Sequence, residues 1–246
     1  MLFFGYVPAA KNGRGKLPIC LERVFFWCPG TPQPPAVVKF DCQTGLRHLG
    51  TLALRIIQYP HPTLRHVSKP LRRVDAELHR IVREMFDLMY EAKGIGLAAN
   101  QVDLPYRLFV LNLESDPATP KDEFVFINPV LRSRHGTTEA EEGCLSLPNL
   151  YGDVRRPERV VLNAFDLSGE EITMPLDGLF ARAVQHEVDH LDGILFIDRL
   201  TSTGLLDAKP TLIEFEERFL RQRERGEIAD EAALAARRLE LEQLRT

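Results

Sequence analysis

The amino-acid sequence predicts an α+β fold in which antiparallel sheets pack around a central metal-binding helix. Three observations predict it: helical spacing of apolar residues at 75–93, strand-like runs between residues 107 and 176, and renewed helical spacing at 179–191. Helices that stand before and after a block of strands, instead of alternating with single strands, are typical of this class.

The first helix is predicted from apolar residues spaced three and four apart, which places them on one face. They are Leu78, Ile81, Val82, Met85, Phe86 and Met89. Gly94 follows them and predicts the end of this helix. The helix at 179–191 carries two histidines and is closed by Gly193.

Four strands are predicted between the two helices. The first two are RLFVLNL at 107–113 and EFVFINPV at 123–130. The other two lie at 158–166 and 171–176, and a turn at Ser168 and Gly169 joins them into a pair.

Composition excludes several classes of protein. The chain has 246 residues, of which 44% are hydrophobic and 27% charged, as in ordinary soluble domains. A formal net charge of −4 predicts no general affinity for nucleic acid or anionic membranes. No apolar run approaches the roughly 18 residues that suggest a membrane span. Cys20, Cys28 and Cys42 lie in the first 50 residues and only Cys144 follows, so the main body holds no disulfide, which favours a reducing compartment.

The two ends differ from the middle of the chain. Residues 1–50 hold six prolines and no sustained period, so we interpret them as a poorly ordered N-terminal extension. No basic residue precedes their apolar start and they contain no serine, which argues against a secretory signal and a transit peptide. The main domain spans 51–205, and 206–246 form a charged tail of one or two solvent-facing helices.

The segment QHEVDH at 185–190 contains the pattern His-Glu-x-x-His. His186 and His190 lie four residues apart, so a helix places both imidazoles on one face, where they can bind one ion. Glu187 stands beside the first histidine, where it can handle the protons of a metal-bound water. The plain alternative is a pair of surface histidines that fall at this spacing by accident.

Cys144, in the segment EGCLSL at 142–147, offers a third ligand. Two histidines and one cysteine leave a fourth position open, which distinguishes a catalytic metal from a structural one. The alternative is a buried cysteine that acts as a small apolar side chain.

The segment GIGLAANQ at 94–101 permits close approach of another backbone, because its glycines and alanines are small. A tight connection from helix to strand would explain the same residues. The pattern GxGxxG is absent and no βαβ unit surrounds the segment, so nucleotide binding is excluded.

Together these three segments, in this order, resemble the signature motifs of the peptide deformylase family. The resemblance spans about residues 54–200 and includes LRIIQYPHPTLR at the start of the body. It implies an enzyme that removes the formyl group from the N-terminal formyl-methionine of new polypeptides and releases formate. It also implies that the protein acts in a bacterial cytoplasm or in an organelle. The resemblance implies no binding to a membrane or to a specific nucleic acid sequence.

The resemblance implies a role for each motif residue. Cys144, His186 and His190 hold the metal, with Fe²⁺ as the ion in many members and Zn²⁺, Ni²⁺ or Co²⁺ able to substitute. Glu187 accepts the proton of the water and passes it to the departing amine. The side-chain amide of Gln101 and the backbone N–H of Leu145 stabilise the oxyanion.

The substrate backbone is expected to pair with residues 94–96, and its methionine side chain needs an apolar pocket. The candidate substrate-binding residues are Gly94, Ile95, Gly96, Leu179 and Ala183. Plain core packing is the alternative for the apolar ones. Two positions depart from the family: Tyr151 stands where many members have arginine, and Arg182 where many have an apolar residue.

Other expectations concern support and rival functions. Glu142 and Arg156 are expected to pair beneath the site, Asp189 to be a surface carboxylate and Ser146 to be structural. A zincin-type protease is the first rival, with a downstream glutamate as third ligand. An inactive homologue that only binds formylated chains or ribosomes is the second. In the tail, Arg221, Arg223 and Arg225 could dock on ribosomal RNA, although a solvated helix face explains them as well.

Overall fold

The computed structural model describes residues 39–40 and 54–246. By its internal contacts the chain divides into residues 1–34 and 35–246, and the described residues all belong to the second unit. The predicted extension at 1–50 therefore lies outside the described residues, apart from 39–40. Cys20, Cys28 and Cys42 also lie outside them.

A five-stranded antiparallel sheet forms the framework, in the order β3-β4-β5-β8-β9. Its strands are β3 (Gly96–Ala98), β4 (Leu108–Leu111), β5 (Phe124–His135), β8 (Arg159–Phe165) and β9 (Glu171–Asp177). The four predicted strands are confirmed, although β5 continues five residues past its predicted end. β3 lies at the edge of the sheet, so one side of its backbone pairs with no strand of this sheet.

Two helices pack on opposite faces of this sheet. They are α1 (Ala76–Glu91) and α2 (Gly178–Leu191), close to their predicted bounds. Successive side chains of a strand point to opposite faces. In β4, accordingly, Leu108 and Val110 belong to the apolar core beneath α1, whereas Phe109 and Leu111 belong to the core beneath α2. The α+β class predicted from the sequence is therefore confirmed.

The ends of both helices follow from local backbone chemistry. The Asp75 side chain accepts a hydrogen bond from the backbone N–H of Leu78 and caps α1. After α1, Lys93 takes the left-handed backbone conformation that ends the helix, at φ 56°. The prediction that Gly94 ends this helix is therefore wrong by one residue. After α2, Gly193 has φ +73° and a Cβ there would lie 2.6 Å from the carbonyl oxygen of Arg65, so glycine is required.

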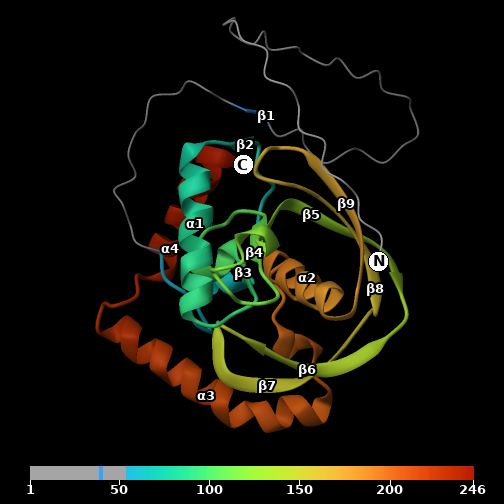
Figure 1. Ribbon diagram of the computed structural model, residues 1–246. Helices are drawn as coiled ribbons and strands as arrows, with labels where there is room; N and C mark the ends of the chain where they lie inside the picture. The colour runs from blue at the N-terminus through green and yellow to red at the C-terminus, as the bar shows by residue number, and fades with distance from the viewer. Residues whose placement is uncertain (1–38, 41–53) are drawn as a thin grey trace, which may run out of the picture. The chain divides into compact units, whose positions relative to one another are not determined.

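A second antiparallel pair, β6 (Thr138–Cys144) and β7 (Leu147–Arg156), was not predicted from the sequence. Its inner face contributes Leu147, Leu150 and Val154 to a third apolar cluster, with side chains from residues 195–197 and from α3 (Ser202–Glu224). Figure 1 shows α2 near the centre, with β5, β8 and β9 curving around one side and the β6–β7 pair below. Helix α2, which carries His186 and His190, is thus enclosed by both sheets.

The charged tail forms helices α3 and α4 (Glu231–Arg245), as predicted. The expectation that they face solvent is wrong for one face of each. These faces bury Ala208, Leu212, Phe215, Phe219, Leu234 and Leu241. Leu212, Phe215 and Phe219 stand at helical spacing, but among so many charges they form only a weak apolar stripe in the sequence.

The remaining elements are short. β1 (Lys39–Phe40) pairs in parallel with β2 (Arg73–Val74), and four 3₁₀ turns lie at Pro62–Arg65, Ala99–Val102, Pro120–Asp122 and Phe196–Arg199. Among the described helices, none is long and apolar enough to cross a membrane.

Candidate metal centre

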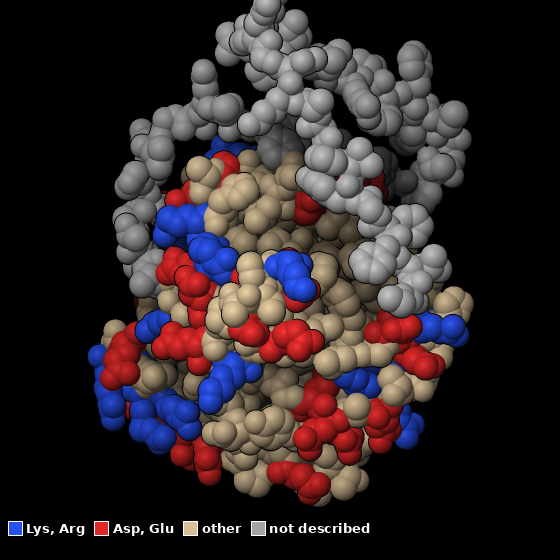
Figure 2. Space-filling view, viewed as in Figure 1, with Lys and Arg blue, Asp and Glu red and all other residues tan. Residues whose placement is uncertain are grey.

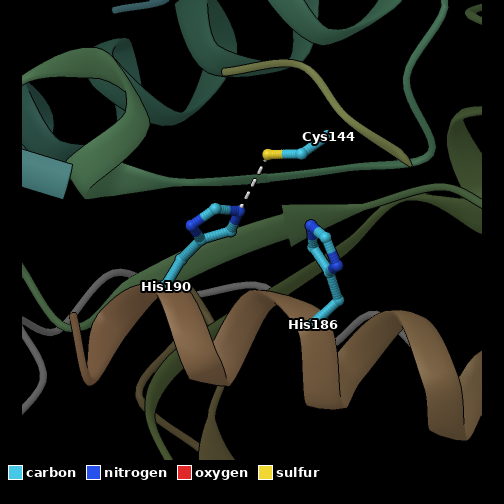
Figure 3. A group of neighbouring side chains, drawn as sticks. All are labelled: Cys144, His186 and His190. Carbon is cyan, nitrogen blue, oxygen red and sulfur yellow. Dashed lines mark hydrogen bonds between the residues drawn. The ribbon is translucent and has the colours of Figure 1, made fainter. Parts of the chain in front are cut away.

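Three side chains converge above α2, as Figure 3 shows. Donor atoms of Cys144, His186 and His190 all lie within 4.8 Å of one another. The two rings rise from successive turns of the helix with centroids 4.9 Å apart, and the sulfur of Cys144 lies 3.2 Å from Nε2 of His190. The one-turn spacing predicted from the sequence thus brings both imidazoles to the thiol.

The β6–β7 connection presents the cysteine. Cys144 is the last residue of β6, and the pairing register shifts between Gly143 and Cys144. This irregularity takes Cys144 out of the regular ladder and opposite Leu147. The strand pair therefore supplies one candidate ligand and the helix two.

The donor set fits a divalent cation. A thiolate and two neutral imidazoles are the ligands of catalytic zinc and related ions. Burial lowers the pKa of His190, which favours the neutral ring. Burial also opposes charge on His186, but Cys144 and Glu142 raise the pKa of that ring to about 10. A cation bound on the cysteine side of the ring would take the place of the proton there, whereas the hydrogen bond between Nδ1 and Glu142 would remain.

Glu187 lies beside this group with its carboxylate buried. Burial raises the pKa of Glu187 to about 7. Its Oε2 atom has no hydrogen-bond partner among the described residues. A Cβ at Gly96 would lie 2.5 Å from Oε1 of Glu187, so the glycine makes room for this carboxylate.

A buried carboxylate contacts the ring of His186, the first candidate metal ligand on α2. Oε2 of Glu142 lies 2.9 Å from Nδ1 of His186, and Arg156 donates to both oxygens of Glu142. Burial opposes ionisation of Glu142, but the hydrogen bonds from Arg156 and His186 hold its pKa well below the usual range. The predicted pairing of Glu142 with Arg156 is confirmed.

The prediction for Asp189 is wrong. Its carboxylate is buried and accepts hydrogen bonds from Arg156, at 2.6 Å, and from Arg199. Sequence position on a helix did not reveal this burial. The role of Asn100 was missed as well: its side-chain amide donates to the backbone carbonyl of His190. Its place inside the segment GIGLAANQ was the available signal.

Gln101 is fixed at both ends of its amide. Oε1 accepts from the backbone N–H of Ala98 at 2.8 Å, so Nε2 must be the donor side. Nε2 lies 3.4 Å from the sulfur of Cys144 and 3.2 Å from Oγ of Ser146. The amide is therefore directed toward the proposed metal ligand, and Ser146 helps to hold it there.

The predicted site residues meet at one cavity of about 630 Å³. Its walls include Gly94, Ile95, Gly96, Gln101, Cys144, Leu145, Leu179, Ala183, His186 and Glu187. His190 is not among the lining residues, and it joins the site through its contact with the cysteine. Leu179 is 55% exposed and lies at the rim, whereas Ala183 is buried.

Comparison with known proteins agrees with this geometry. The family model for polypeptide deformylase matches residues 53–205. A peptide deformylase of Rhodopirellula baltica is 53% identical over 198 residues, which cover 79% of this chain and 96% of that protein. One from Neisseria meningitidis serogroup C is 48% identical over 148 residues, covering 60% of this chain and 87% of that protein.

Solved structures give the same result. A Plasmodium falciparum peptide deformylase superposes with a TM-score of 0.67 and 39% identity, covering 68% of this chain and 98% of that one. A plant peptide deformylase superposes with a TM-score of 0.67 and 37% identity, covering 76% and 97%. The chain therefore belongs to the polypeptide deformylase family of enzymes.

Proposed function

We propose that this chain hydrolyses the N-terminal formyl group of newly made polypeptides and releases formate at the site around Cys144, His186 and His190. One observation carries the proposal. Two of the three candidate metal ligands, Cys144 and His186, line one substrate-sized cavity together with Glu187 and the fixed amide of Gln101. The third, His190, lies behind them in contact with the sulfur of Cys144. This is the set that hydrolysis of a small linear amide requires.

Cys144, His186 and His190 would hold one divalent cation, and three protein ligands leave a position for solvent or substrate. When bound, such a cation lowers the pKa of water and polarises the formyl carbonyl. The family resemblance favours Fe²⁺, with Zn²⁺, Ni²⁺ or Co²⁺ able to substitute. The ligand types alone would favour zinc.

Glu187 is suited to move a proton from the attacking water to the departing amine. Its carboxylate lines the cavity, and burial excludes competing solvent. Because Oε2 is unpartnered within the described part of the chain, this oxygen is available to accept a proton.

The oxyanion would receive two hydrogen bonds, from Nε2 of Gln101 and from the backbone N–H of Leu145. The amide of Gln101 is held by Ala98 before any substrate arrives, so it needs no reorganisation. Leu145 lines the same cavity directly after Cys144. Losing one such donor costs roughly 2.7–4 kcal/mol of transition-state stabilisation in other enzymes.

The substrate backbone would extend the sheet along 94–96, because β3 is an edge strand. The methionine side chain would then lie against Ile95, Leu179 and Ala183, which all line the cavity. In this assignment residues 51–205 form the catalytic domain, and 206–246 a helical tail that follows it.

New chains that begin with formyl-methionine are made on bacterial and organellar ribosomes. We therefore propose a bacterial cytoplasm or an organelle as the location. Figure 2 shows basic side chains gathered at the lower left, where Figure 1 places the end of α3. Two arginines there already pair with acidic neighbours, Arg221 with Glu217 and Arg225 with Glu227. Docking of this segment on ribosomal RNA stays a prediction, and a solvated helix face explains the same charges.

The protease alternative would take its third ligand from Glu214, Glu216 or Glu217. Within the described residues, the one group of three suitable ligand atoms includes Cys144 and none of these glutamates. Glu216 instead accepts a hydrogen bond from the hydroxyl of Tyr59 at 2.9 Å. This observation favours deformylation.

Replacement of Glu187 tests the mechanism. The holoenzyme should release formate from a formyl-Met-Ala peptide and leave casein intact. Glu187→Ala should keep its metal, because it is not a ligand, and lose most turnover, by about 10²–10⁴-fold. Metal analysis and a formate assay on the same preparation separate the two effects. Wild-type turnover in this variant, or cleavage of casein instead of the formyl peptide, would contradict the proposal.

A further inference from the structure

Arg182 connects the substrate cavity to the carboxylate that holds a metal-binding histidine. Leu179, Arg182, Ala183 and His186 follow the helical spacing of three and four, so they share one face of α2. All four line the cavity. The Arg182 side chain is nevertheless only 10% exposed, which means that its charged end is directed into the protein.

The guanidinium of Arg182 fastens α2 to both strands of the β6–β7 pair. Nη1 donates to the carbonyl oxygen of Val154 on β7 at 3.0 Å, and Nη2 to that of Thr138 on β6 at 3.1 Å. Nη1 also donates to Oε1 of Glu142 at 2.7 Å. One side chain thus spans the helix and the strand pair that together supply the metal ligands.

Glu142 has no remaining capacity to accept hydrogen bonds. Oε1 accepts from Arg156 at 2.6 Å and from Arg182 at 2.7 Å. Oε2 accepts from Arg156 at 2.8 Å and lies 2.9 Å from Nδ1 of His186. A carboxylate offers about four lone-pair sites, and all are used here. Its plane is therefore fixed from three directions, and Arg182 supplies one of them.

We propose that Arg182 is a positioning residue with two functions, which rests on the function proposed above. Its guanidinium fixes Glu142 and, through it, the ring of His186 for metal binding. Its aliphatic stem forms part of the wall against which the methionine side chain of the substrate packs. Long cationic side chains commonly divide in this way between an apolar stem and a polar end.

Removal of the guanidinium has two opposing effects on a nearby cation. It removes a positive charge, which favours cation binding, and it frees Glu142 to rotate, which disfavours binding. The charge of Arg182 is already partly offset by Glu142 at 2.7 Å, a carboxylate that it shares with Arg156, so the orientation effect should dominate. Loss of comparable outer-shell partners costs about 10–100-fold in metal affinity or activity.

The experiment compares Arg182→Met, Arg182→Ala and a matched control, Arg107→Met, with the wild type. Arg107 also links the end of α2 to a strand, since it donates to Asp192 at 2.6 Å and to the carbonyl oxygen of Pro129 on β5. It donates no hydrogen bond to Glu142. Zn²⁺ affinity is measured by chelator competition without substrate, at a temperature where circular dichroism shows every variant folded. The visible spectrum of the Co²⁺-loaded proteins reports the geometry at the ligands.

Both Arg182 variants should bind Zn²⁺ about tenfold more weakly and show a changed Co²⁺ spectrum, whereas Arg107→Met should match the wild type. Arg182→Met keeps an apolar stem, so only Arg182→Ala should raise KM for formyl-Met-Ala. Unchanged or tighter Zn²⁺ binding in Arg182→Met, or an equal loss in Arg107→Met, would overturn the positioning role. Equal KM in the two Arg182 variants would contradict the proposed contact between the aliphatic stem of Arg182 and the methionine side chain of the substrate. Metal binding is measured without substrate. If the wild type released no formate, the proposed function would be contradicted, and the metal-binding result for Arg182 would still stand on its own.

Discussion

The carboxylate of Glu187 fits beside the cavity because residue 96 has no side chain. A Cβ there would lie 2.5 Å from Oε1 and 3.0 Å from Cδ of Glu187. Because the atoms nearest to the new methyl group all belong to the Glu187 side chain, Gly96→Ala should displace this buried carboxylate. Misplacement of a catalytic group by about 1 Å can cost 10²-fold in rate. We expect kcat for formyl-Met-Ala to fall by about that factor while the metal content stays unchanged.

Gly204→Ala provides the matched control for this substitution. In the first turn of α3, the nearest atom to a new Cβ is Oγ1 of Thr201, at an ordinary 3.4 Å. This variant should keep wild-type kinetics. If Gly96→Ala has the same kcat as Gly204→Ala, the close approach between residue 96 and the carboxylate has no catalytic consequence.

Residue types and spacing were sufficient to predict that Cys144, His186 and His190 form one group of candidate ligands, since they are rare donors in a recognisable order and the structure brings them together. The sequence did not reveal in the same way which charged side chains are buried. Asp189 was expected at the surface, yet Arg156 and Arg199 bind it inside the protein. Whether a charged residue is buried depends on partners that lie far away in sequence, and no local pattern contains them.

Elements with a clear apolar period were predictable and those without it were not. α1, α2 and the β8–β9 pair show helical or strand-like patterns over their whole lengths. β6 reads TEAEEGC, and only Glu142 of its residues is buried. A strand whose buried position is a glutamate, paired internally by Arg156 and Arg182, gives no hydrophobic alternation. The strand that presents the cysteine was missed for that reason.

Helix α4 is held to the body by a buried carboxylate, which predicts a pH-dependent stability. Glu242 bonds to His66 at 2.7 Å and to Lys69 at 2.6 Å. Burial opposes its ionisation, but Lys69 and His66 lower the pKa of Glu242 below the ordinary value of a glutamate. Its stabilising effect is thus complete above that value and is lost as the pH falls through the lower folded-state pKa.

Glu242→Gln should destabilise the protein by about 1.5–3 kcal/mol at pH 7, and by less below about pH 4. Urea unfolding at several pH values measures the difference. Glu240→Gln, at an exposed position on the same helix, should have little effect at any pH. A loss in Glu242→Gln that is the same at pH 7 and at pH 3.5 would contradict the assignment to this ion pair.

The site as a whole is assembled from segments far apart in the chain. Gln101 precedes α2 by more than 70 residues, and Cys144 arrives from a strand pair outside the five-stranded sheet. The motifs could be found in the sequence, but their mutual distances could not, because these depend on how both sheets enclose α2. The 3.2 Å contact between Cys144 and His190 is a result of tertiary packing alone.

This arrangement makes the metal a link between two parts of the fold. A cation bound by Cys144, His186 and His190 joins β6 to α2, and it binds the folded chain but not an unfolded one with separated ligands. At a free concentration of about 100 times Kd, such binding adds about 2.7 kcal/mol of stability. For a protein of this size we expect Tm to rise by about 5–10 °C on loading with Zn²⁺ and to fall again on chelation. Cys144→Ala loses one ligand, so the same Zn²⁺ concentration should shift its Tm much less. An equal shift in wild type and variant, measured by scanning calorimetry, would place the bound metal elsewhere.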